Sequence, residues 1–342
     1  MNLLLKQQIR YRSLYLLFIA ILFVFFILNI AMGSVHIPFL DTCKIVFQQQ
    51  IDNDVHQAVV WKIRLPRSLA TLFGGAALAV AGLLLQVFFR NPIVGPYVLG
   101  ISSGATLMVA LVMLTGLSAG IGGIHPFFLS LAAFAGALGV MAIVLAVAAK
   151  VRDIVTLLVI GLMMGYLCSA VSSILIAFAE KERVHGFVLW TFGSFSGFRW
   201  DELYILALGG GVLLLGTFLL CKPLNAFLLG ENYAQSMGVN IKLFRYLIVF
   251  LSSALAGLVT AFAGPVAFIG LAVPHMARLS LGTADNKILI PGVILLGALT
   301  TSVCDLIARL AFSPVELPVS AITSFFGAPI VIGLLLKRRT AL

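Results

Sequence analysis

Few side chains in this sequence combine the type and spacing that chemistry requires. Asp305 and Arg309 lie four residues apart in an apolar stretch, so on a helix they share a face and can neutralise each other as a structural ion pair. The sequence has no HExxH, no G-x-S-x-G and no Walker-type GxxxxGKS/T motif, and its five histidines show no metal-site spacing. We therefore expect no catalytic residue, no metal site and no ATPase site of its own.

A polar, glycine-punctuated stretch runs from Cys221 to Arg245, CKPLNAFLLGENYAQSMGVNIKLFR. Lys222, Lys242 and Arg245 flank it, and basic residues gather on the cytoplasmic side of membrane proteins. The stretch is therefore predicted to be cytoplasmic. From its residues alone, a plain interhelical loop and a contact for another subunit are about equally good interpretations.

The elements that position these groups must be membrane helices. Of the 342 residues, 61% are hydrophobic and only 10% are charged, whereas in soluble domains about a quarter are charged. A span needs about 20 apolar residues, so this length holds about ten helices. A β-barrel would show alternating segments of about ten residues, and here the apolar runs are long and unbroken. The net charge of +10 then reflects basic residues at cytoplasmic helix ends rather than a nucleic-acid partner.

The whole chain, 1–342, is predicted to be a single all-α transmembrane domain with both termini in the cytoplasm. Residues 34–63 and 179–202 are expected outside, and 222–242 inside. Trp61, Trp190 and Trp200 fall at the predicted outer boundary, where tryptophan is enriched. In the first outer segment, PFLDTCKIVFQQQ is predicted to form a short interfacial helix. The predicted spans are about 14–33, 66–89, 96–116, 126–148, 154–178, 203–221, 243–263, 265–277, 288–311 and 319–336.

Gly161, Gly165, Ser169 and Ser173 are small residues at four-residue intervals in the fifth predicted span. Such stripes let membrane helices approach closely. The residues alone favour packing within the chain, and a subunit interface or a pathway wall is the alternative.

An ion-coupled secondary transporter is the main alternative function. It would need ionisable side chains near the middle of its spans, because such charges are retained for function. The predicted spans have almost none, which disfavours this class. A membrane enzyme or a structural scaffold is a further alternative, but no motif supports it.

Several blocks of the sequence resemble the FecCD family, the permease subunits of type II ABC importers for iron-siderophore complexes, haem and cobalamin. They occur in the family's order from about residue 60 to the C-terminus. The blocks are RLPRSLATLFGGAALAVAGLLLQVFFRNPIVGPYVLGISSGA, LWTFGSFSG, LLGENYAQSMGVN, GPVAFIGLAVPHMARLSLGTADNKILIPG and DLIARLAFSPVELPVSAITSFFGAPIVIGLLLK.

The resemblance implies the type II ABC importer permease fold, with ten helices per subunit, in the inner membrane of a bacterium. It implies a homodimer that contacts membrane lipid and two cytoplasmic subunits that bind the ATP and Mg. An external binding protein would deliver a metal chelate, which alternating access would carry inward. No cofactor is expected in this chain.

The resemblance also assigns roles to residues. Arg64, Arg67 and Arg309 match positions that meet acidic residues of the binding protein; anchoring to lipid phosphate is the alternative. The small stripe would line the dimer axis, which the fifth and tenth spans line in this family. Two short coupling helices would contact the ATPase, with Ala234 letting it approach closely. The coupling residues are Leu224, Leu229, Gly230, Glu231, Ala234, Met237 and Gly238.

Overall fold

The computed structural model describes residues 2–33, 35, 37–48, 54–115, 126–150, 154–313 and 315–339. Within these ranges every regular element is a helix, as the sequence predicts. Residues 34, 36 and 49–53 of the predicted outer segment lie outside the described ranges.

Each of the ten predicted spans overlaps one long helix. The helices are α1 (Asn2–Ala31), α4 (Leu65–Phe88), α5 (Ile101–Leu114), α6 (Pro126–Lys150), α7 (Ile154–Phe178), α9 (Trp200–Leu219), α12 (Ile241–Ala263), α13 (Ile269–Leu281), α14 (Asn286–Leu310) and α15 (Val319–Arg339). Seven helical stretches of the described chain are long and apolar enough to cross a membrane, and α5 and α15 contain shorter apolar helices. At a rise of about 1.5 Å per residue, the 13 residues of α13 fall short of the roughly 30 Å hydrocarbon layer.

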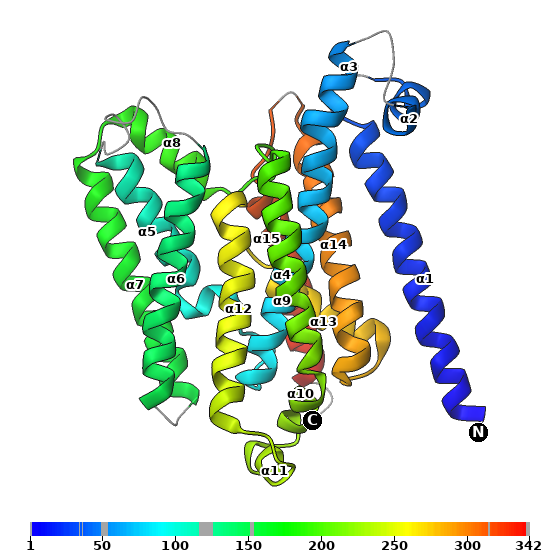
Figure 1. Cartoon of the computed structure of the whole chain (residues 1–342), viewed down its shortest axis with the longest axis vertical. Helices are drawn as coiled ribbons and strands as arrows, with labels where there is room; N and C mark the ends of the chain where they lie inside the picture. Colours follow the sequence, from blue (N-terminus) through cyan, green and yellow to red (C-terminus); the bar gives the residue numbers. More distant parts are fainter. Residues whose placement is uncertain are drawn as a thin grey trace.

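Shorter helices lie at the two ends of this bundle (Figure 1). One end carries α2 (Phe39–Gln48), α3 (Asp54–Ala58) and α8 (Lys181–Thr191); the opposite end carries α10 (Cys221–Leu228) and α11 (Glu231–Ser236), together with the start of α1. The first end is called the outer end and the second the inner end below. The helix predicted in PFLDTCKIVFQQQ is present as α2, and it exposes Phe39, Leu40 and Phe47.

The core is built around α4, which packs against α9, α12, α13 and α14. Its most apolar window is 83% buried, whereas that of the peripheral α7 is only 17% buried. Glycine makes the close packing possible: a Cβ on Gly82 would lie 1.7 Å from the Gly270 carbonyl oxygen, and one on Gly75 would lie 2.4 Å from that of Gly297. The backbones of α4, α13 and α14 are therefore in direct contact, as small residues allow in membrane proteins.

Candidate functional site

The predicted coupling segment forms a helical turn at the inner end. We call residues 221–239, which contain α10 and α11, the elbow. Two glycines shape it: Gly230 between the two helices has φ +130°, and Gly238 after α11 has φ +86°. Side chains with a Cβ rarely adopt these conformations, so glycine is needed at both turns. The sharp turns predicted at these two positions are confirmed.

Aromatic packing attaches the elbow to the bundle. The fully buried Phe227 of α10 lies between Phe88 of α4 and Phe244 of α12, with ring centroids 6.2 Å and 5.0 Å away. Leu224 and Ala234 are also fully buried. Ala234 thus faces the bundle, because the turn at Gly230 directs that side of α11 inward. Its burial runs against close approach of a partner at this residue, and its role in coupling stays a prediction.

Polar contacts add a second attachment. The Asn225 side-chain amide donates to Asp285 Oδ1 at 2.6 Å, and its carbonyl oxygen accepts from the backbone N–H of Asn286 at 2.9 Å and from Asn286 Nδ2 at 2.7 Å. Asn225 therefore ties α10 to the start of α14. Glu231 pairs with Arg245 of α12 at 2.7 Å, so both helices of the elbow are fixed.

Replacing Asn225 with Ala should loosen the elbow without unfolding the bundle. Three hydrogen bonds disappear and Asn286 loses two of its contacts, which should lower the free energy of local opening by about 1–3 kcal/mol. Hydrogen–deuterium exchange of the amides in 221–238 measures this opening. Asn232→Ala, at an exposed site in α11, is the control and should leave exchange unchanged. Equal exchange in both variants would contradict the anchoring role.

The elbow also exposes large apolar side chains. Leu229 is 69% exposed, Met237 64% and Tyr233 46%. Of these, Leu229 and Met237 were predicted to take part in coupling, and Tyr233 was not. Tyr233 lies in α11 four residues before Met237, which caps the end of that helix, and this helical spacing is the sequence signal that would have identified it.

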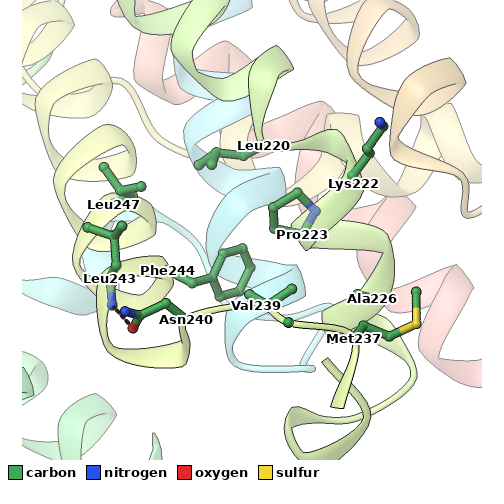
Figure 2. A pocket seen from close by; sticks show the side chains of 11 residues that line it. Leu220, Lys222, Pro223, Ala226, Met237, Val239, Asn240, Leu243, Phe244 and Leu247 are labelled. Carbon is green, nitrogen blue, oxygen red and sulfur yellow. Dashed lines mark hydrogen bonds between the residues drawn. The ribbon is translucent and has the colours of Figure 1, made fainter. Parts of the chain in front are cut away.

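A groove of about 500 Å³ lies between the elbow and the first turns of α12. Figure 2 shows Phe244, Val239 and Pro223 converging on it, while the ammonium group of Lys222 points away. Asn240 also lines the groove, and its side chain caps α12 by accepting a hydrogen bond from the Leu243 backbone N–H at 3.1 Å. The inner end thus presents exposed apolar residues beside an apolar groove.

A buried charge cluster holds the outer ends of α4 and α14 together. Arg67 Nη2 and Nε contact Asp305 at 2.9–3.1 Å, and Nη1 contacts Glu316 at 2.9 Å. The side chain of Arg67 is 4% exposed and that of Asp305 is fully buried. Asp305 therefore forms its ion pair with Arg67, and none of the ion pairs found among the described residues joins it to Arg309. The prediction that Asp305 pairs with Arg309 is wrong.

Arg64 and Arg309 are also buried, 3% and 5% exposed. Arg309 donates to the backbone and side-chain oxygens of Asn29 in α1, both at 2.9 Å. Arg64 donates to the carbonyl oxygens of Ile30, Ala31 and Val35. This geometry runs against direct docking of a partner on Arg64, Arg67 and Arg309, because their guanidinium groups face the interior and are engaged there. Docking through them stays a prediction.

The small stripe of α7 divides into two parts. A Cβ on Gly161 would lie 2.9 Å from Leu99 Cα, and one on Gly165 would lie 3.5 Å from Gly100 Cα, so both pack against the segment before α5. Ser169 and Ser173 are exposed. A four-residue interval advances about 40° around a helix, so the stripe turns away from α5 along its length. The first half supports packing within the chain; an interface or pathway role of the second half stays a prediction.

Long apolar helices with a compact elbow at one end are the architecture of a multi-pass membrane protein. A model of the FecCD transport family matches residues 21–337. The chain therefore belongs to the FecCD transport family and is a permease subunit of the ABC importer kind.

Individual relatives agree with this placement. The vitamin B12 import system permease protein BtuC of Salmonella typhi is 38% identical over 281 residues, which cover 81% of this chain and 83% of that protein. The BtuC protein of Salmonella arizonae matches to the same extent, 38% over 281 residues. A solved structure described as an inward-facing metal-chelate type ABC transporter superposes with a TM-score of 0.83 at 28% identity, covering 96% of this chain and 99% of that one. PsaBC from Streptococcus pneumoniae, solved in complex with Fab, shares the fold with a TM-score of 0.51 at 15% identity over 78% of this chain and 88% of its own.

Proposed function

We propose that this chain is the membrane subunit of an ATP-driven importer in a bacterial inner membrane, and that the elbow receives the ATPase. The observation that carries the proposal is the two-sided elbow. One side is attached through Phe227, Asn225 and Glu231, and the other exposes Leu229, Tyr233 and Met237. A force applied to the exposed side would reach α12 and α14 through the attached side.

The orientation and the assembly follow from the same proposal. The elbow faces the cytoplasm, so the start of α1 and the end of α15 are cytoplasmic and all ten long helices take part in the membrane domain. Two copies associate through α7 and α15. Both helices expose apolar side chains, including Tyr166 (67%), Phe178 (89%) and Phe325 (74%). Each copy binds one cytoplasmic subunit that holds ATP and Mg.

The proposed cargo is a bulky metal chelate, with cobalamin first among the candidates because the BtuC relatives are vitamin B12 permeases. An external binding protein delivers it to the outer end, and alternating access moves it inward. The buried arginines contribute there by fixing the outer ends of α1, α4 and α14, which form part of the proposed docking surface.

Uptake of labelled cobalamin or ferric chelate into proteoliposomes tests the proposal. The vesicles contain the chain with its ATPase and binding protein, and uptake should require ATP and both partners. Uptake driven by a proton or sodium gradient in vesicles that lack the ATPase would overturn it and would support an ion-coupled transporter.

A further inference from the structure

A second pocket at the inner end has an unbalanced positive charge. It has a volume of about 390 Å³ and lies at the end of α4, beside the last turn of α10 and the middle of α13. The residues that matter for its chemistry are Gln86, Arg90, Asn91, Leu228, His275 and Arg278. Among the described residues that line it there is no aspartate or glutamate.

Arg90 occupies a backbone position where glycine is usual. It has φ +48° and follows Phe89, the residue that caps the end of α4. The turn is a Schellman motif: the N–H of Arg90 donates to the Val87 carbonyl at 3.2 Å, and the N–H of Asn91 donates to the Gln86 carbonyl at 3.1 Å. Residues with a Cβ disfavour this left-handed conformation. Strain of this kind is concentrated at functional sites, so the Arg90 side chain is a candidate for a role that glycine could not fill.

The Arg90 side chain is directed by an aromatic ring. Its guanidinium carbon lies 5.0 Å from the centroid of Phe227, within the range of a cation–π contact. Because Phe227 is fully buried between α4 and α12, it is a fixed platform, and it holds one positive charge at the pocket.

Arg278 supplies a second positive charge from α13. Its Nη1 donates to Gln86 Oε1 at 2.7 Å, and Gln86 is itself held because its Nε2 donates to the Leu271 carbonyl at 3.0 Å. Gln86 orients the guanidinium but carries no charge. No ion pair found among the described residues includes Arg278 or Arg90. Two guanidinium groups thus share one pocket without a counter-charge.

We infer that this pocket binds a phosphate-type oxyanion, either free phosphate or the phosphate of an anionic phospholipid headgroup. Two arginines on separate elements match the several oxygens and the charge of a phosphate better than the single charge of a carboxylate. Asn91 adds an amide to the lining and His275 an imidazole, and both can contact further oxygens. Leu228 provides an apolar edge for the rest of a lipid. The inference does not rest on the elbow binding an ATPase.

Two binding measurements on the purified full-length chain test the inference and separate the two sources. Native mass spectrometry measures retention of phosphatidylglycerol against phosphatidylcholine, and ³¹P NMR titration measures binding of inorganic phosphate in lipid-depleted detergent. Arg278→Gln and Arg90→Gly should each weaken binding at least about tenfold, since each removes one charged contact. Lys287→Gln, at an exposed basic site at the start of α14 and outside the pocket, is the control and should bind as the wild type does.

Arg90→Gly keeps the test independent of folding. Glycine relieves the strain at φ +48°, so the melting temperature of the Arg90→Gly variant should be equal to or above that of the wild type. Its phosphate or lipid binding should nevertheless fall. Selective retention of phosphatidylglycerol without phosphate binding identifies the lipid as the source, and phosphate binding in detergent identifies the free anion; either supports the inference. The inference is overturned if the wild-type chain binds neither phosphatidylglycerol nor phosphate. It is also overturned if both variants bind as tightly as the wild type. The inference is also overturned if the two variants lose only their association with the ATPase and keep wild-type phosphate and lipid binding. That result would indicate that the pocket binds a carboxylate of the partner protein.

Discussion

Replacing Arg67 with Met should lower the free energy of unfolding by about 3–5 kcal/mol, because it leaves the buried carboxylate of Asp305 without its closest partner. Asp305 is fully buried, so water cannot replace the lost hydrogen bonds. Denaturant titration of the purified chain in detergent measures the loss. The control is Arg183→Met, because Arg183 pairs with Glu180 near the surface, with 3.0 Å between Arg183 Nε and Glu180 Oε2. It should change the free energy of unfolding by only about 0–1 kcal/mol.

The double variant separates a pairing energy from a packing defect. Asp305→Leu together with Arg67→Met removes both charges, and apolar replacements of buried ion pairs are often nearly neutral. The double variant should therefore recover most of the stability lost by Arg67→Met alone. If Arg67→Met is no more harmful than Arg183→Met, the cluster does not hold the outer ends of α4 and α14 together.

The membrane helices could be predicted because each corresponds to a long apolar run in the sequence. The residues at which they begin and end depend on local contacts, which hydropathy does not report. Helix α9 begins at Trp200, before the predicted start at 203, because Glu202 accepts a hydrogen bond from the Arg199 backbone N–H at 3.1 Å. This is a capping-box arrangement. Helix α13 begins at Ile269 rather than 265, after Phe268 in the left-handed conformation. Hydropathy carries neither signal, and the Phe268 conformation is unexpected for a bulky residue.

The turns of the elbow were predictable for a different reason. Gly230 and Gly238 stand in a polar stretch, and only their conformational freedom explains glycine there. Which side of α11 faces the bundle was not predictable, because it depends on how Phe227 inserts between α4 and α12. The burial of Ala234 has this origin.

Side-chain partners far apart in the sequence were the least predictable part of the site. Helical spacing favoured Asp305 with Arg309, four residues away. In the structure the carboxylate pairs with Arg67, 238 positions away, because α4 and α14 pack so closely at Gly75 and Gly297. The same packing turns the arginines inward, so residue type alone suggested a surface role for groups that are buried.

Placing aspartate at both Leu229 and Met237 should abolish most ATP-driven transport while leaving the bundle folded. Both side chains are more than 60% exposed, so the substitutions remove little internal contact and should change stability by only about 0.5 kcal/mol. In the proposed complex they lie under the ATPase. Two buried carboxylates at an apolar contact should weaken ATPase binding at least about 30-fold, the effect expected for a hot-spot loss of about 2 kcal/mol.

A binding assay with the detergent-solubilised chain measures its affinity for the ATPase, and uptake by proteoliposomes measures transport. Thermal unfolding verifies that the variant is folded. Leu40→Asp is the matched control: it changes a similarly exposed leucine, 73%, in α2 at the opposite end, and should leave ATPase binding unchanged. Wild-type binding and uptake by the Leu229→Asp/Met237→Asp variant would show that the partner engages another surface. If binding persists and uptake alone is lost, the elbow transmits motion without supplying affinity, and its rigid attachment through Asn225 and Phe227 becomes the part to test next.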